Sequence, residues 1–320
     1  YSYSTTQGKL FLKKPGTNIN YYLFILATDS KEKSLIYSEI DNSGNGAVIS
    51  KYNKLHKEVI CEKLTATKHC NNKAYWVVTA YYENKPDPFW ELSFKRTVFL
   101  AYLVDENGVH ESPIRSEFDF ILPRLGQIKF NNASNLLATA TNSALYLFNF
   151  DNASGQITLN NKIDLDIKNG YGIEFSPNDS LVYINENQYN IYTNSLVKLL
   201  NNYSLLGWQR GLDDKLYSFY SSPTNSFLDL NNYSNIPNIG NYFDNGWLLT
   251  GPVPEFKMAR IEYPNFTGST CNLDTSFINI PIANYPNMGI GMPNYPSYLF
   301  NHPSSEFTYT GNCSNDIFHF

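Results

Sequence analysis

The sequence predicts an all-β protein with a β-propeller fold, and three observations support this. The chain contains 25 Tyr and 21 Phe, and these side chains favour half-buried strands. Short apolar segments recur along the chain with turn-forming residues between them. Two of these segments repeat at the spacing of one four-stranded propeller blade.

The composition already excludes several classes of protein. A chain of 320 residues can bury a core as one large domain or two ordinary ones. Its 24 basic and 29 acidic residues give a net charge of −5, so the basic stripe that nucleic-acid binding needs is missing. No apolar run approaches the roughly 18 residues of a membrane-spanning helix. We expect a soluble protein without bound nucleic acid.

The strand signals are short apolar and aromatic segments, six of which lie in the first half of the chain: 10–12, 21–26, 34–37, 74–79, 97–103 and 144–148. Clusters of Asn, Asp, Ser and Gly separate them, and these residues favour tight hairpin turns. Such clusters occur at 42–46, 71–72, 105–108 and 151–155. Regular short strands of this kind predict a sandwich, a barrel or a propeller.

An internal repeat decides between these architectures. The segment 128–138 aligns without gaps on 173–183, at an offset of 45 residues. Each copy is an apolar strand, a polar turn and a second apolar strand, and looser copies lie at 64–77 and 206–219. Such a unit cannot bury both faces of its sheet alone, so neighbouring units must stack around an axis. We therefore predict a propeller of seven blades that resemble WD40 and YVTN blades.

The pattern weakens towards the C-terminus. From Gly251 onward the chain is rich in Pro, Asn, Gly and Tyr, which predicts an irregular closing segment of the propeller. Residues 306–320 resume strand alternation. We therefore expect a propeller domain over residues 1–303 and the start of a following β domain over 304–320.

Several motifs resemble one family of bacterial proteins. They include Gln7–Gly16, Glu62–His69, Gly172–Pro177, Tyr263–Asn272 and Gly291–Tyr298. Together these segments are similar to a propeller module of large Bacteroidota surface proteins, which are gliding-motility-associated or adhesin-like. In that family the module is followed by Ig-like or PKD-like repeats, and a C-terminal signal directs export through the type IX secretion system.

The resemblance implies where this chain acts. It implies a secreted or outer-cell-surface location, partners in the other domains of one long chain, and contact with the type IX machinery during export. It also implies that the first blade lacks N-terminal residues and that 304–320 begin an Ig/PKD-like domain. Asp179-Ser180-Leu181 fits the short O-glycosylation signal of that phylum, which makes Ser180 a modification candidate.

The four cysteines lack the Cys-x-x-Cys spacing of zinc sites, and the five histidines form no ligand cluster. We expect no metal and no cofactor. Cys61 and Cys70 lie close enough in sequence for adjoining strands, which makes them the first candidates for a disulfide. Free buried thiols are the alternative.

Carboxylates could support catalysis, because propeller glycosidases place Asp and Glu at the channel mouth. The candidates are Asp164, Asp166, Glu174, Asp213 and Asp214, but no pair is set apart by its sequence context. Structural roles are the simpler interpretation. Asp151–Gly155 lacks the alternating acidic pattern of a calcium loop, so a hairpin turn explains it better.

Aromatic residues give the one positive binding signal. Tyr81, Tyr82, Phe89 and Trp90 lie in an insertion that departs from the blade spacing. Exposed rings there could stack on sugars or anchor a protein. The alternative is that Phe89 and Trp90 only cover the edge of a blade.

These observations predict a non-catalytic binding or adhesion module that presents propeller loops to a glycan or a protein. Two alternatives stay open: a propeller-fold enzyme acting on polysaccharide, and a structural spacer or cap of a surface filament. Two carboxylates facing each other at a channel-mouth pocket would favour the enzyme, whereas a channel filled by Tyr and Phe would favour binding.

Overall fold

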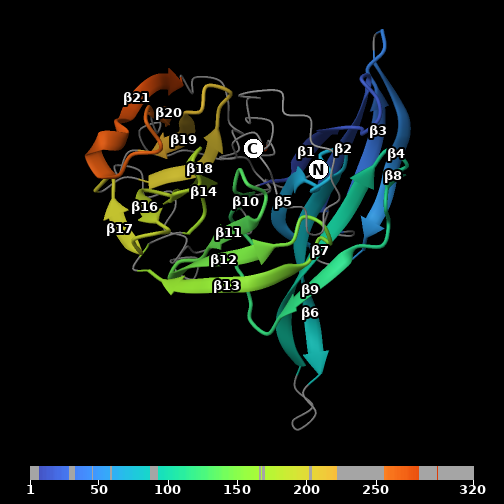
Figure 1. Ribbon diagram of the computed structural model, residues 1–320, viewed down its shortest axis with the longest axis horizontal. Helices are drawn as coiled ribbons and strands as arrows, with labels where there is room; N and C mark the ends of the chain where they lie inside the picture. Colours follow the sequence, from blue (N-terminus) through green and yellow to red (C-terminus); the bar gives the residue numbers. More distant parts are fainter. Residues whose placement is uncertain are drawn as a thin grey trace, which may run out of the picture.

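The computed structural model describes residues 7–28, 33–44, 46–57, 60–86, 93–165, 167, 170–201, 204–221, 256–280 and 294. Within these ranges the chain forms five antiparallel sheets around a common axis (Figure 1). The protein is therefore an all-β propeller, and its described residues build five blades, numbered here from the N-terminus. The predicted seven blades are not supported.

Blades 1 and 2 contain the longest strands. Blade 1 consists of β1 (Lys9–Lys13), β2 (Asn20–Thr28), β3 (Lys33–Asp41) and β4 (Ala47–His56). Blade 2 consists of β5 (Ile60–Lys68), β6 (Tyr75–Pro86), β7 (Ser93–Asp105), the short β8 (Gly108–Val109) and β9 (Ile114–Phe118). Both β8 and β9 pair with β7, so β9 serves as the outer strand of blade 2.

Blades 3 to 5 are four-stranded meanders. Blade 3 consists of β10 (Ile128–Phe130), β11 (Leu136–Ala140), β12 (Ala144–Phe150) and β13 (Ile157–Asp164). Blade 4 consists of β14 (Ile173–Phe175), β15 (Leu181–Ile184), β16 (Asn187–Asn190) and β17 (Ser195–Lys198). Blade 5 consists of β18 (Ser204–Arg210), β19 (Leu216–Ser221), β20 (Phe256–Ile261) and β21 (Leu273–Ile280).

The first strand of each blade lies at the axis. β1 contacts β5, β5 contacts β10, β10 contacts β14, and β14 contacts β18. At this radius the backbones approach closely. A Cβ atom added to Gly172 would lie 2.6 Å from the backbone N of Gly207, so only glycine fits between blades 4 and 5 there.

One turn geometry recurs between the first and second strands of blades 2 to 5. In each turn a backbone N–H bonds the carbonyl three residues earlier, and that donor residue has a left-handed φ of 55° to 61°. The four donors are Asn72, Ser134, Asp179 and Asp214. A type I turn followed by a left-handed residue closes a tight hairpin. The polar turn in the sequence repeat therefore sets the same local structure in each blade, and these turns share one face of the disc, termed here the turn face.

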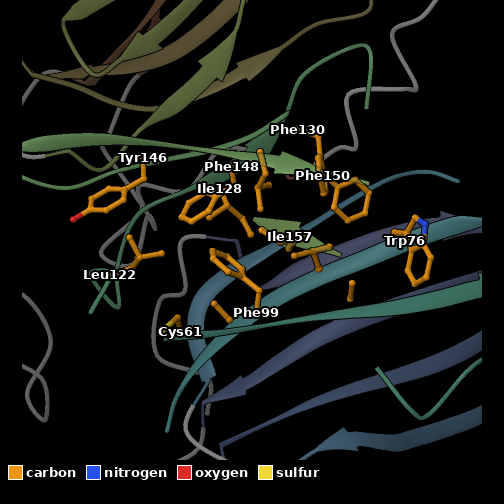
Figure 2. Packing of buried hydrophobic residues seen from close by; sticks show 14 of the residues in the cluster. Cys61, Trp76, Phe99, Leu122, Ile128, Phe130, Tyr146, Phe148, Phe150 and Ile157 are labelled. Atoms are coloured by element: carbon orange, nitrogen blue, oxygen red, sulfur yellow. The ribbon is translucent and has the colours of Figure 1, made fainter. Parts of the chain in front are cut away.

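Apolar side chains fill the spaces between consecutive blades. Figure 2 shows the cluster between blades 2 and 3, in which Phe99 of β7 meets Phe148 of β12 edge to face with ring centroids 5.1 Å apart. Comparable clusters join blades 1 and 2, blades 3 and 4, and blades 4 and 5. Alternate residues of each strand thus face opposite neighbours, which explains the strand periodicity of the sequence.

Five of the six strand segments predicted from the first half of the chain fall within strands, and the sixth, 74–79, begins one residue before β6. The described residues form five blades rather than the predicted seven, and the chain length per blade varies. β10 and β14 begin 45 residues apart, at Ile128 and Ile173, but β6 and β7 have 12 and 13 residues whereas β15 has 4. The repeat length therefore cannot be extended over the whole chain.

The closing segment is more regular than predicted, because β20 and β21 complete blade 5. The domain start predicted at 304–320 lies outside the described residues and stays a prediction. The helical element of the described chain is a short 3-10 turn, η1 (Gly268–Cys271). No described helix is long and apolar enough to cross a membrane.

The predicted Cys61–Cys70 disulfide is wrong. Cys61 is a free thiol buried in the cluster between blades 2 and 3 (Figure 2), and Cys271 is also free and buried. Cys70 is disulfide-bonded, so its partner is neither of these two residues. The prediction failed because Cys61 lies at the start of β5 and points into a core, whereas Cys70 lies in the turn beyond the other end of that strand.

Candidate functional site

Four inner strands bury a long polar side chain near the propeller axis. These side chains are Lys63 of β5, Lys129 of β10, Glu174 of β14 and Gln209 of β18. Lys129 Nζ lies 2.9 Å from Glu174 Oε2 and donates a hydrogen bond of 2.8 Å to Gln209 Oε1. The axis is thus occupied by polar groups that satisfy one another, rather than by the aromatic plug or the facing carboxylates considered from the sequence.

Lys63 is held differently from Lys129. Its Nζ donates to the carbonyl oxygens of Leu125 and Gly126 at 2.9 and 3.0 Å. Burial lowers the pKa of Lys63 to about 8, because the charged ammonium loses its hydration. These contacts fasten blade 2 to the segment that enters blade 3, which is a structural role.

Two glutamine side chains bind the inner strands together at their N-terminal ends. Gln7 accepts a bond from Ile128 N at 2.8 Å and donates one to Ile128 O at 2.9 Å. Gln127 accepts bonds from Ile173 N and Trp208 N at 3.0 and 2.9 Å and donates to Trp208 O. Ile128 and Ile173 are equivalent positions of the repeat, so each glutamine side chain bonds the backbone of the first residue of an inner strand.

The structure separates the five carboxylate candidates. Glu174 is buried in the axial ion pair, and Asp164 is exposed at the end of β13. Asp166 lies outside the described residues. Asp213 and Asp214 lie together in the first turn of blade 5 and line a pocket. Asp213 and Asp214 are therefore the candidates that the structure places at a described pocket.

That pocket, termed here the turn pocket, is lined by Pro177, Asp213, Asp214 and residues 262–266. Pro177 comes from the first turn of blade 4, and residues 262–266 connect β20 to η1 in blade 5. Its volume is about 190 Å³, which is small beside the roughly 300–1,000 Å³ of typical small-molecule sites. It can take one small ring or one side chain.

Two exposed aromatic rings line the turn pocket. Tyr263 and Phe266 are 52% and 58% exposed, and their ring centroids are 6.3 Å apart in an edge-to-face arrangement. The backbone N of Phe266 bonds to Tyr263 O, and Phe266 O accepts a bond of 2.8 Å from Gln188 Nε2. The two rings are thus presented to solvent on a hydrogen-bonded turn.

Each lining carboxylate has a partner within the protein. Asp214 Oδ1 pairs with Arg210 Nη2 at 2.5 Å, and Glu262 Oε1 pairs with Lys215 Nζ at 2.6 Å. Asp213 Oδ2 accepts a bond of 2.7 Å from the hydroxyl of Tyr217. Burial, assisted by this bond to a carboxylate, raises the pKa of Tyr217 to about 12.

Glu262 is also close to a second cation. Its Oε2 lies 3.0 Å from Arg260 Nη2, but among the described residues this buried oxygen accepts no hydrogen bond. Arg210, Lys215 and Arg260 thus stand beside Asp213, Asp214 and Glu262. The charges around the turn pocket are balanced.

The turn face beneath the pocket is rigidly built. Asp179 accepts hydrogen bonds of 2.8 and 3.0 Å from the backbone N atoms of Asn132 and Ala133. Arg210 Nη1 donates to Asn132 Oδ1 at 2.6 Å. Burial raises the pKa of Asp179 despite these bonds. The first turns of blades 3, 4 and 5 are therefore fixed relative to one another.

Sequence reasoning missed part of this pocket. Glu262 and the two exposed rings come from the segment predicted to be an irregular closing stretch. Tyr263-Pro-Asn-Phe266 was a usable signal, because two aromatic residues around a Pro-Asn turn are difficult to bury together. Asp213 and Asp214 were among the predicted carboxylate candidates, but their sequence context did not set them apart from the other three.

The predicted aromatic binding residues are not confirmed. Tyr81 is 1% exposed and accepts a bond of 2.6 Å from Arg115 Nη1, so it is not the exposed ring expected. Tyr82 is half-buried, and its hydroxyl donates to Leu122 O. Phe89 and Trp90 lie outside the described residues.

The glycosylation candidate Ser180 lies on the turn face. It is half-buried, and its hydroxyl donates a bond of 2.7 Å to Asn178 Oδ1. Its modification stays a prediction. No described His, Cys, Asp and Glu residues gather in a group that could hold a metal ion.

Comparisons with known proteins find only distant similarity. No family model matches the chain, and no curated protein does either. Sqt1 from Chaetomium thermophilum is 11% identical over 68% of this chain, with a TM-score of 0.41, and this chain covers only 58% of that one.

Two bacterial structures cover more of the chain. A protein assigned as TolB from Agrobacterium tumefaciens is 12% identical over 90% of this chain and 85% of its own, with a TM-score of 0.42. Hydrazine synthase from Kuenenia stuttgartiensis is 12% identical over 82% and 64%, with a TM-score of 0.45. Identities this low carry no functional argument.

Proposed function

We propose that this chain is a non-catalytic binding module of a large exported bacterial cell-surface protein, and that the turn pocket is its contact site. The observation that carries this is the pair of exposed rings, Tyr263 and Phe266, on a hydrogen-bonded turn beside a pocket. Single exposed aromatic residues are common, but clusters of exposed aromatic residues commonly mark binding surfaces. A preformed surface also binds with little ordering cost.

The same pocket is less suited to catalysis. Glycoside hydrolysis needs one carboxyl group that donates a proton and a second that acts as nucleophile or base. Asp214 and Glu262 are paired with cations, and Asp213 accepts the Tyr217 hydroxyl. Such carboxylates are suited to accept hydrogen bonds from a ligand. The three of them around one pocket are nevertheless the reason to keep a polysaccharide-degrading enzyme as the second candidate.

The wider setting of the module rests on the sequence resemblance. In this proposal the module acts on the outer cell surface in adhesion, gliding or assembly. The other domains of the same chain are its permanent neighbours, and the type IX machinery contacts it during export. As a third candidate the propeller is a spacer or cap in a surface filament, with the turn face buried against another chain.

A plate assay separates the binding module from the enzyme. Wells coated with surface polysaccharide or with surface protein receive the wild type or the double variant Tyr263→Ala/Phe266→Ala, and the same wells are assayed for new reducing ends. Binding that the double variant loses, without new reducing ends, is the expected result. New reducing ends would establish an enzyme. Equal retention of both proteins, or of neither, would overturn the proposed site.

A further inference from the structure

We infer that the turn pocket takes a neutral carbohydrate ring, an inference that rests on the binding function proposed above. The pocket leaves polar groups of Asn265 and Asp214 without hydrogen-bond partners among the described residues. Asn265 Oδ1 accepts a bond of 3.0 Å from Asn178 N, but its amide NH₂ donates to no described residue. Arg210 donates to Oδ1 of Asp214, whereas Oδ2 accepts no hydrogen bond from the described residues. The pocket therefore offers two donors and at least one acceptor.

A sugar ring complements this combination. Each sugar hydroxyl both donates and accepts, so it can satisfy the Asn265 amide and a carboxylate oxygen together. Its C–H faces are apolar and match the exposed rings of Tyr263 and Phe266 and the ring of Pro177. A volume of about 190 Å³ suits one ring at a chain end rather than several linked rings.

A cationic ligand, such as a lysine side chain of a protein partner, fits the same site less well. An ammonium group has three donors and no acceptor, so it would leave the Asn265 amide without a partner. Arg210, Lys215 and Arg260 already stand beside the acidic residues of the pocket, which removes the excess negative charge that would attract a cation. The same charge balance gives an anionic sugar no net attraction to the pocket.

Asn265→Asp provides the sharpest test. The substitution keeps an oxygen for the Asn178 N–H, removes both amide donors and adds one negative charge. A neutral sugar loses hydrogen bonds and is expected to bind about tenfold more weakly, whereas a cation would bind more tightly. This one variant therefore changes the affinities for the two ligand classes in opposite directions.

Saturation-transfer NMR and titration measure the binding of methyl glycosides of glucose, galactose, mannose, fucose and N-acetylglucosamine to the full chain. Glucosamine, glucuronate and N-acetyl-lysine amide serve as charged probes. Phe266→Ala is expected to weaken neutral-sugar binding about tenfold or more. Tyr192→Ala removes a ring that is 75% exposed outside the pocket and should leave binding within twofold. Thermal melts of each variant confirm folding.

The outcomes distinguish this inference from the function on which it rests. Saturable binding of a neutral glycoside that Asn265→Asp and Phe266→Ala weaken supports it. Tighter binding of N-acetyl-lysine amide to Asn265→Asp than to wild type, without glycoside binding, overturns it in favour of a protein partner and leaves the binding function standing. Binding of no probe, together with no retention in the plate assay, overturns both.

Discussion

Lys129 and Glu174 hold the same position in consecutive copies of the sequence repeat, and their side chains form a buried ion pair with Nζ and Oε2 2.9 Å apart. Equivalent positions become neighbours because the inner strands lie side by side around the axis. A change from lysine to glutamate between two copies therefore creates a complementary pair at the centre of the molecule. Because both side chains are almost completely buried, neither can be lost without a cost.

Lys129→Met is expected to reduce the free energy of unfolding by about 3–5 kcal/mol, because it leaves Glu174 charged and unpaired in the interior. The double variant Lys129→Met/Glu174→Leu should recover much of this loss, since it removes both buried charges. Urea unfolding of the wild type, the single variants Lys129→Met and Glu174→Leu, and the double variant gives the coupling free energy between the sites. Additive losses, with no recovery in the double variant, would contradict this interpretation.

Gln127 is expected to contribute more to the free energy of unfolding than an exposed glutamine does. Gln127→Ala leaves the buried N–H groups of Ile173 and Trp208 without an acceptor, which should cost about 2–5 kcal/mol of unfolding free energy. Gln156→Ala, at an exposed turn, is the matched control and should cost less than about 1 kcal/mol. Thermal and urea unfolding measure both. Equal losses of unfolding free energy in the two variants would show that the hydrogen bonds of Gln127 stabilise the fold no more than those of an exposed glutamine.

The lowered pKa of Lys63 leads us to expect that the free energy of unfolding depends on pH. Its pKa is lowered to about 8 in the folded protein from 10.5 in the unfolded chain, so between these values the unfolded state binds more protons. Stability therefore increases as pH rises through this window, by up to about 3 kcal/mol.

The Lys63→Met variant isolates this contribution, because the other titrating groups are common to both proteins. The difference in unfolding free energy between wild type and variant, measured from pH 7 to 10.5, should shift in favour of the wild type above pH 8. A constant difference, or one that shifts towards the variant, would show that Lys63 is not desolvated as described.

The cysteines should differ in reactivity. Burial raises the thiol pKa of Cys61, and that of Cys271 to about 11, so neither should react with iodoacetamide in the native protein at pH 8. After unfolding without reductant both should be alkylated, whereas Cys70 should not because it is disulfide-bonded. Peptide mass mapping measures this. A Cys61–Cys70 peptide would restore the pairing first predicted from the sequence.

The repeat made the blades predictable because each copy carries the same turn chemistry. Ser134 and Asp179 stand at equivalent positions and share a left-handed φ of 59°. The number of blades was not predictable, because β6 and β7 lengthen one blade without altering its pairing. Local turn signals therefore identify a blade without fixing how much chain it uses.

The turn pocket was harder to predict than the fold. Asp213 and Glu262 are distant in sequence and meet only because β19 and β20 pair, with Leu216 opposite Ile261. Tyr81 was predicted to be an exposed binding ring, but its hydroxyl accepts a hydrogen bond from Arg115. The sequence does not indicate this contact. Contacts that depend on strand pairing between distant segments leave no pattern in a single sequence.

The most direct test of the binding account is a residue-resolved map of the contact surface. Backbone amide NMR shifts of the isotope-labelled full chain are recorded with and without the surface polysaccharide or protein retained in the plate assay. We expect the amide signals of Asp213, Asp214, Asn265 and Phe266 to shift together, while those of Tyr192 and Phe11, exposed elsewhere, stay unchanged. Shifts confined to other surfaces, with these four residues unmoved, would contradict it.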